Sequence, residues 1–165
     1  EPLSAGGELN RGYAAISREL KYYRVFSLGR QFGSMLGRKL LESDRFRDVD
    51  TVVPVPLHWT RRFSRGYNQA QIIAGAVADE LGARLRTDLL VRERRTGSQT
   101  SRSSEQKAAN VKGAFRARAG ASPKHILLVD DVFTSGSTLS ECHRALREEY
   151  PWPVKISAAT LASVK

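Results

Sequence analysis

The sequence predicts an α/β domain in which a mostly parallel, twisted sheet is covered by helices on both faces. Short apolar runs rich in β-branched residues alternate along the chain with segments of helical periodicity, as in βαβ units. The clearest run, residues 126–129 (ILLV), is apolar at every position, which is typical of a strand buried on both faces. A length of 165 residues suits one domain, so we expect residues 1–165 to form a single unit.

The first half of the chain predicts helix, strand and helix in that order. Residues 16–41 carry apolar side chains at three- and four-residue steps, which indicates one or two helices within a helical amino-terminal part at 1–45. Gly29, Gly33 and Gly37 recur every four residues there, and we expect this row to let a neighbouring backbone approach closely. Residues 50–57 (DTVVPVPL) predict a strand that turns into a rigid loop. Residues 69–81 predict a helix that stops at Gly82.

The second half predicts a long loop between two further strand and helix signals. Residues 85–91 are a candidate strand, and residues 92–112 are polar, basic and rich in Ser and Thr, which indicates a flexible and functional loop. A strand is expected at 125–129, then a turn with Gly and Ser, then a helix from about 138 to 149. Residues 154–161 predict the closing strand.

Charge and composition narrow the partners and the compartment. The chain has 27 Lys and Arg against 17 Asp and Glu, a net charge of +10, which favours nucleic acid, anionic lipid or phosphorylated small molecules, although a solvated basic face is equally consistent. No apolar run approaches the roughly 20 residues of a bilayer span, so we expect no membrane insertion. The opening residues do not resemble a signal peptide, and Cys142 is the single cysteine, which indicates a cytoplasmic location.

Residues 126–138 (ILLVDDVFTSGST) carry the strongest chemical signal. Asp130 and Asp131 are expected at the carboxyl end of a buried strand, where open α/β sheets place their ligands. Two carboxylates suit ribose hydroxyls and can also help to hold Mg²⁺ and its waters. The next residues form a small-residue loop that leads into a helix, where backbone N–H groups and hydroxyls can hold a phosphate. These loop residues are Thr134, Ser135, Gly136, Ser137 and Thr138.

This segment resembles the motif of the type I phosphoribosyltransferases that binds 5-phosphoribosyl 1-diphosphate (PRPP). The resemblance implies the type I phosphoribosyltransferase fold, with Asp130 and Asp131 on the ribose hydroxyls and residues 134–138 on the 5-phosphate. It also implies that Asp130 and Asp131 contact Mg²⁺ through water or the PRPP hydroxyls. Thr134 stands where relatives that handle oxopurines have an aspartate, which makes oxopurine salvage a poorer fit.

Residues 52–58 (VVPVPLH) resemble the loop of the same family that holds the diphosphate. The residues concerned are Pro54, Val55, Pro56 and Leu57. Two prolines near a strand end are also explained by an edge strand, where proline does not interrupt the ladder. Both interpretations stay open at this stage.

A longer pattern resembles the ComF subgroup of this family, competence-type proteins of bacterial DNA uptake and their relatives. It consists of HWTRRFSRGYNQ at 58–69 and LVRERRTGSQTSRSSEQKAANVKGAF at 90–115. Members commonly carry an upstream module with four cysteines that binds zinc. The present sequence lacks it, either because this chain is shortened or because this branch has none.

Several residues in these two segments are candidates for the second-substrate pocket or for a lid. Arginine forks match phosphate oxygens, and Asn and Gln side chains can orient a base or a carboxamide. A basic lid would exclude water and neutralise the leaving diphosphate. The alternatives are a packed or surface histidine and simple solvent exposure of each basic side chain. The candidates are His58, Arg61, Arg65, Asn68, Gln69, Arg94 and Lys107.

The resulting functional prediction is a Mg²⁺-dependent phosphoribosyltransferase that uses PRPP and an unidentified small-molecule acceptor with a nitrogen nucleophile. The alternative is a ComF-like accessory protein of DNA uptake that binds PRPP or a nucleotide with little or no catalysis and whose basic middle segment contacts DNA. A scaffold with a relic fold is a third account. The sequence leaves the oligomeric state open, a homodimer included.

Overall fold

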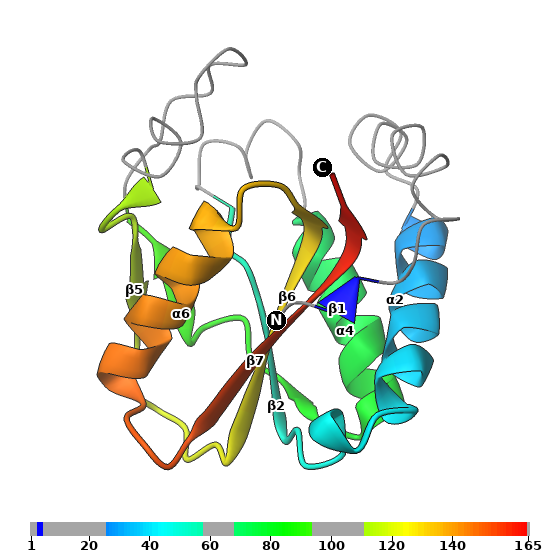
Figure 1. Ribbon diagram of the computed structural model, residues 1–165, viewed down its shortest axis with the longest axis horizontal. Helices are drawn as coiled ribbons and strands as arrows, with labels where there is room; N and C mark the ends of the chain where they lie inside the picture. The colour runs from blue at the N-terminus through cyan, green and yellow to red at the C-terminus, as the bar shows by residue number, and fades with distance from the viewer. Residues whose placement is uncertain (1–2, 5–25, 58–67, 94–110, 165) are drawn as a thin grey trace.

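A five-stranded parallel sheet forms the centre of the computed structural model, which describes residues 3–4, 26–57, 68–93 and 111–164. The strand order is β1-β7-β6-β2-β3, and every neighbouring pair is parallel. The strands are β1 (Leu3–Ser4), β2 (Thr51–Pro54), β3 (Arg84–Leu85), β6 (His125–Phe133) and β7 (Lys155–Ser163). In Figure 1 the sheet lies between α6 (Ser137–Glu149) on one side and α2 (Phe26–Leu41) with α4 (Gln69–Leu81) on the other. The predicted α/β class, with helices on both faces, is therefore confirmed.

The two faces of β6 bury alternate side chains, which explains why this strand is apolar throughout. Leu127 and Val129 pack into the cluster formed with α2 and α4, whereas Ile126 and Leu128 pack into the cluster formed with α6. All four side chains are at most 1% exposed. Since successive strand residues point to opposite faces, a central strand with two buried faces needs an uninterrupted apolar run.

Two glycines of the row in α2, Gly33 and Gly37, let a neighbouring backbone approach closely, as expected. A Cβ atom on Gly33 would lie 2.7 Å from the Cβ of Ala76, and one on Gly37 would lie 2.7 Å from the Cβ of Glu80. Both partners belong to α4, so the missing side chains let the two helix backbones approach closely. At the rim of this contact the Arg38 guanidinium pairs with the Glu80 carboxylate at 3.3 Å.

The amino-terminal part differs from the helical prediction in one respect. Leu3–Ser4 forms the short edge strand β1, which pairs in parallel with β7 through Ala159 and Thr160. The expected helical segment at 16–41 is present as α2 from Phe26 onward, and its first ten positions lie outside the described residues. A 3₁₀ turn at Asp44–Phe46 then leads into β2.

The prediction of one strand at 85–91 is wrong, because this segment contributes to two short strands that belong to different sheets. β3 ends at Leu85 on the edge of the main sheet, and β4 (Leu90–Arg92) pairs antiparallel with β5 (Phe115–Ala117) over α6. Leu89 and Leu90 are at most 1% exposed, because they pack in the core cluster that includes residues of α6. This packing explains why the chain leaves the edge of the main sheet after Leu85. The link between the strands holds an ion pair of Arg86 with Asp88 at 2.8 Å.

The remaining predicted elements are confirmed, α4 with its predicted bounds and α6 and β7 with shifted ones. α4 spans Gln69–Leu81, and Gly82 follows as its C-cap with φ of 63°. α6 begins at Ser137, and β7 extends to Ser163. Of the expected flexible loop at 92–112, Arg92 belongs to β4 and residues 93, 111 and 112 are described, while 94–110 lie outside the described residues. In the described part of the chain, no helix has the length and apolar character needed to cross a membrane.

Candidate functional site

The candidate site lies at the carboxyl edge of the sheet, around the end of β6. β6 continues through both aspartates to Phe133, so the prediction that the strand ends at Val129 is wrong. The cause is β7, which pairs with β6 as far as Phe133 and Ser163. Its other neighbour, β2, ends at Pro54 opposite Val129. Asp130 is therefore the first residue of β6 beyond the end of β2.

Asp130 combines a carboxyl group with an apolar environment. Alternate residues of a strand point to the same face, so Asp130 lies on the face of Ile126 and Leu128, toward α6. The backbone N–H of Asp131 donates to Asp130 Oδ1 at 2.9 Å. Desolvation by the surrounding protein and then the charge of Asp131 hold the pKa of Asp130 well above its usual 3.8, although part of the residue's surface reaches solvent. The guanidinium of Arg92 is close enough for its positive charge to oppose this rise in the pKa of Asp130.

The loop after β6 is a tight turn into a helix amino terminus. Thr134 and Ser135 are exposed, and Gly136 has φ of 74°, a left-handed conformation that favours glycine. A Cβ at Gly136 would also come within 3.0 Å of the Phe133 ring. The hydroxyls of Ser135 and Ser137 lie 2.5 Å apart, so the two side chains gather on one side of the turn.

The first turn of α6 is open to an anion. Gly136 is its N-cap, no side chain caps the helix, and no acidic residue lies in the first turn. The backbone N–H groups of Ser137, Thr138 and Leu139 precede the first possible intrahelical bond, which Ser140 N–H makes to Gly136 O at 2.8 Å. Unpaired N–H groups and the helix dipole both favour a phosphate at this position.

The predicted diphosphate loop starts beside Asp130. Val55 N–H donates to Val129 O at 2.8 Å, and Val55 O accepts from Asn68 Nδ2 at 3.1 Å. Pro54, Pro56 and Leu57 line a small cavity of about 80 Å³ together with Asn68, Gln71 and Thr87. In the described part of the chain, β3 pairs only with Thr51 and Val52 of β2, so at Pro54 the strand has a neighbour on the β6 side alone, and both interpretations of the two prolines stay open.

Two of the second-substrate candidates, Asn68 and Gln69, lie at the start of α4. Asn68 is the N-cap of α4: its Oδ1 accepts from Ala70 N–H at 3.2 Å while its Nδ2 holds the loop at Val55. Both ends of the amide are thus occupied, and the side chain fastens the proline loop to the helix. Gln69 is 4% exposed, and its Nε2 has no hydrogen-bond partner among the described residues.

The structure gathers part of the predicted site and leaves part untested. One edge of the sheet brings together Asp130, Asp131, residues 134–138 and residues 54–57. Thr160, which sequence patterns do not single out, lies opposite Asp130 in β7 and has a buried Oγ1 without a partner in the described part of the chain. Five further candidates lie outside the described residues and stay predictions: His58, Arg61, Arg65, Arg94 and Lys107.

The two carboxylates of Asp130 and Asp131 could bind Mg²⁺ only together with waters and ligand oxygens. Among the described residues no group of three or more His, Cys, Asp or Glu side chains gathers to hold a metal ion. Mg²⁺ is usually bound by one or two carboxylates together with waters and substrate oxygens. The adjacent carboxylates of Asp130 and Asp131 match that pattern, and a cation would offset the cost of ionising the enclosed Asp130 carboxyl.

A parallel sheet with an acidic pair and a glycine-bearing turn at the end of its central strand defines a protein of the type I phosphoribosyltransferase class. The chain belongs to the phosphoribosyl transferase domain family, whose model matches residues 68–165, and it is of the ComF-like kind. The family predicted from the sequence motifs is therefore confirmed.

The chain is similar to three curated bacterial proteins. The chain is 30% identical over 134 residues to the DNA utilization protein YhgH of Salmonella typhi, covering 79% of this chain and 59% of that protein. It is 28% identical over 139 residues to Competence protein F of Haemophilus influenzae, with coverage of 81% and 61%. It is 30% identical over 129 residues to Competence protein ComFC of Streptococcus pneumoniae, with coverage of 78% and 54%. The chain thus spans somewhat more than half the length of these relatives.

Among solved structures, the chain is similar to orotate phosphoribosyltransferase from Aeropyrum pernix. The TM-score is 0.47 and the sequence identity 17%, over 89% of this chain and 64% of that one.

Proposed function

We propose that the chain binds PRPP at the carboxyl edge of its sheet and transfers the phosphoribosyl group to a nitrogen nucleophile, with release of diphosphate. One observation carries the proposal: the strand with Asp130 and Asp131 runs directly into a left-handed glycine turn that opens α6 without a capping side chain. Carboxylates suit the ribose hydroxyls, and free helical N–H groups suit the 5-phosphate. One continuous segment thus offers groups for both parts of the ligand.

In the proposed reaction the C1–O bond to diphosphate breaks and its electron pair leaves with the diphosphate. The lone pair of the acceptor nitrogen forms the new bond to C1, and the nitrogen then loses its proton to solvent. Asp130 and Asp131 hold the ribose by its hydroxyls, while the loop at 134–138 fixes the phosphate end. Such positioning lowers the barrier because the sugar is oriented before the charge develops. When bound, Mg²⁺ would neutralise charge on the diphosphate oxygens.

Release of diphosphate in the presence of PRPP, Mg²⁺ and a panel of nitrogen nucleophiles tests the transfer. We expect Asp131→Ala to abolish turnover while circular dichroism shows an intact fold. Turnover that survives this substitution would remove the proposed role of Asp131.

The second candidate is an accessory role in DNA uptake with little catalysis, which the names of the curated relatives favour. It predicts that the chain retards DNA in a gel and that this binding weakens steeply as salt rises, because phosphate contacts release counterions. DNA binding combined with no turnover on any nucleophile would favour this account over the first. A cytoplasmic location is part of both proposals.

A further inference from the structure

A second and larger cavity lies at the opposite edge of the sheet from the candidate PRPP site. Its volume is about 710 Å³, within the range of roughly 300–1,000 Å³ that is usual for small-molecule sites. It is bordered by the first residues of β6 and β7, His125 and Lys155, whereas Asp130 lies toward the other end of β6. We call it the amino-edge groove. Its walls include Arg45, Arg47, His143, Arg147, Trp152 and Lys155.

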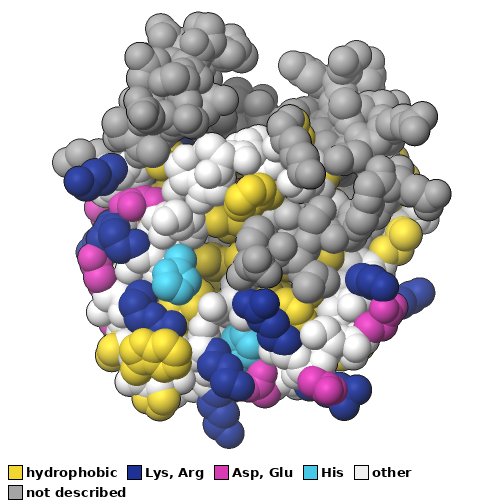
Figure 2. Space-filling model, viewed as in Figure 1, with side chains coloured by type: hydrophobic (Ala, Val, Ile, Leu, Met, Phe, Trp, Pro, Cys, Tyr) yellow, Lys and Arg dark blue, Asp and Glu magenta, His cyan; other side chains and the backbone are white. Residues whose placement is uncertain are grey.

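The groove presents basic side chains whose acidic neighbours are already engaged. Asp48 contacts both His125 and Lys155, and Asp44 pairs with Arg47 at 2.9 Å. Arg45 and Arg147 contact no carboxylate in the part of the chain that the structure describes. Figure 2 shows Lys, Arg and His side chains gathered on the lower part of this face. The groove therefore has positive charge to offer an anion.

Arg147 and Trp152 form a fixed pair at the groove. The Arg147 guanidinium donates to Val154 O at 2.7 Å and to Tyr150 O at 3.3 Å, which holds the side chain in place. Its Cζ atom lies 4.7 Å from the centre of the Trp152 ring, a cation–π contact. Trp152 is nevertheless 77% exposed, the largest value among the exposed large hydrophobic residues described. Most of a large aromatic surface is thus available to a ligand.

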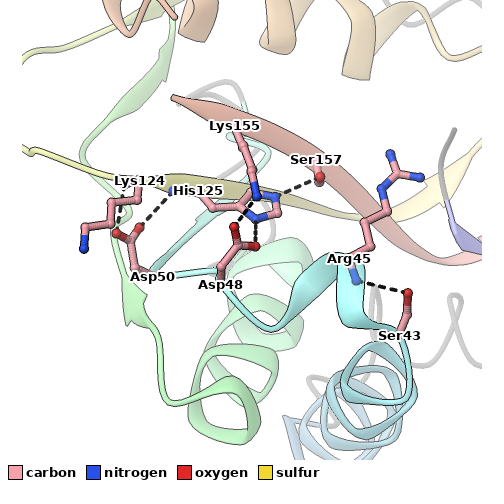
Figure 3. Close-up of polar contacts among 8 residues, drawn as sticks. All are labelled: Ser43, Arg45, Asp48, Asp50, Lys124, His125, Lys155 and Ser157. Atoms are coloured by element: carbon pink, nitrogen blue, oxygen red, sulfur yellow. Dashed lines mark hydrogen bonds and ion pairs between the residues drawn. The ribbon is translucent and has the colours of Figure 1, made fainter. Parts of the chain in front are cut away.

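Hydrogen bonds hold the residues at the floor of the groove. His125 is 1% exposed, and its ring nitrogens contact Asp48 Oδ1 at 2.7 Å and Ser157 Oγ at 2.9 Å (Figure 3). Asp50 holds the preceding residue, since its Oδ2 accepts from the backbone N–H of Lys124 at 2.8 Å. A floor already held by hydrogen bonds needs little ordering when a ligand binds, which favours affinity.

We propose that the amino-edge groove binds a nucleotide, with the base stacked on Trp152 and the phosphate on Arg45 and Arg147. An exposed indole beside unneutralised guanidinium groups matches the two chemical parts of a nucleotide, a planar base and an anion. An inorganic anion would leave the indole unused, and an apolar ligand would leave the arginines unused. The nucleotide is either free or part of a single strand, and this site is independent of PRPP binding at the other edge.

Quenching of Trp152 fluorescence tests the stacking directly. The chain has two tryptophans, so Trp59→Phe leaves Trp152 as the only one. This variant is titrated with deoxyadenosine monophosphate, with a short oligodeoxyadenylate and with inorganic phosphate. We expect the nucleotide or the oligonucleotide to quench the emission and inorganic phosphate to leave it unchanged. Saturation by the mononucleotide identifies a free nucleotide, and quenching by the oligonucleotide alone identifies a strand.

Calorimetric titration of single variants with the nucleotide probes tests whether Trp152 and Arg45 bind the nucleotide. Trp152→Ala and Arg45→Ala should each weaken binding about tenfold or more, since stacking and charge-assisted contacts are each worth on the order of a tenfold change. Arg30→Ala removes one exposed charge from α2 and serves as the matched control, which should bind as the parent does. The proposal is overturned if neither nucleotide probe quenches Trp152, or if all three variants bind alike. PRPP binding is measured on the same variants and should not change, so the two sites are judged separately.

Discussion

Asp130 has an environment that favours ligand binding over stability. Its carboxyl is surrounded by protein beside a second carboxyl, and both circumstances disfavour the ionised form. Groups held in such environments mark functional sites more often than they contribute to stability. Burial likewise raises the pKa of the thiol of Cys142, a residue of α6 that is 0% exposed and packs in the core.

Asp130→Asn should raise the free energy of unfolding at neutral pH. The folded-state pKa of Asp130 lies above 3.8, so the folded protein binds the proton more tightly, and the wild type loses stability as pH rises from 3.8 through the folded pKa. The variant has no such loss. Urea denaturation at several pH values measures the difference, which should shrink toward pH 4. Asp79→Asn, an exposed change on α4, is the control, and parallel profiles for wild type and Asp130→Asn would contradict the account.

The positions of candidate site residues could be predicted from the sequence only where a local motif exists. The segment 126–138 placed Asp130, Asp131 and the glycine turn in one strand, loop and helix unit, because those residues are contiguous. Asn68 stays a second-substrate candidate, and its contact as the N-cap of α4 depends on the helix start directly after it. Thr160 could not be found, since its position beside Asp130 follows from the register of β6 and β7.

At the scale of elements, the contact between α2 and α4 depends on glycine. Gly33→Ala should destabilise the protein by about 1–3 kcal/mol, because its Cβ would lie 2.7 Å from Ala76 Cβ and from Ile73 O. Gly75→Ala on α4 is the matched control, since its Cβ would meet Leu85 Cδ2 at an ordinary 3.8 Å. That change should stabilise by about 0.5–1 kcal/mol through helix propensity. Thermal denaturation compares the two, and equal effects would contradict close packing as the role of Gly33.

The amino ends of β6 and β7 are joined by Asp48, whose stabilising effect depends on pH. Hydrogen bonds from Lys155 and His125 lower the pKa of Asp48 from 3.8 to about 2. The stabilisation is therefore complete above pH 4 and is lost as pH falls toward 2. Asp48→Asn should cost no more than about 1 kcal/mol at pH 6, since the carboxylate is half exposed. Acid titration of unfolding should show the wild-type advantage vanishing near pH 2, and an advantage independent of pH would be the contrary result.

Long periodic elements were predictable and short ones were not. The apolar spacing and Gly82 gave α4 its observed bounds, because burial on one face repeats over more than three turns. β1 and β3 have two residues each, and two residues carry no period. The division of 85–91 between two sheets follows from where Leu89 and Leu90 find a core, which is a tertiary effect.

At the scale of the whole molecule, the two edges of the sheet carry different chemistry. The carboxyl edge brings together groups from β6, the start of α6 and the proline loop. The amino edge brings together residues from 44–48, 125, 143–147 and 152–157 in the second cavity. No pattern in the sequence joins these distant segments, whereas the net charge of +10 predicted an anionic partner without locating its surface.

The most direct test of the account is calorimetric titration of PRPP in the presence of Mg²⁺. We predict saturable binding to the wild type, loss of binding in the Asp130→Ala, Asp131→Ala double variant, and unchanged binding in Asp79→Ala. Gly136→Ala should weaken binding, because a side chain at this positive φ meets the Phe133 ring and would displace the turn that we propose holds the 5-phosphate. Absence of wild-type binding at millimolar PRPP, or equal binding by the double variant, would contradict the assignment of this edge as the PRPP site.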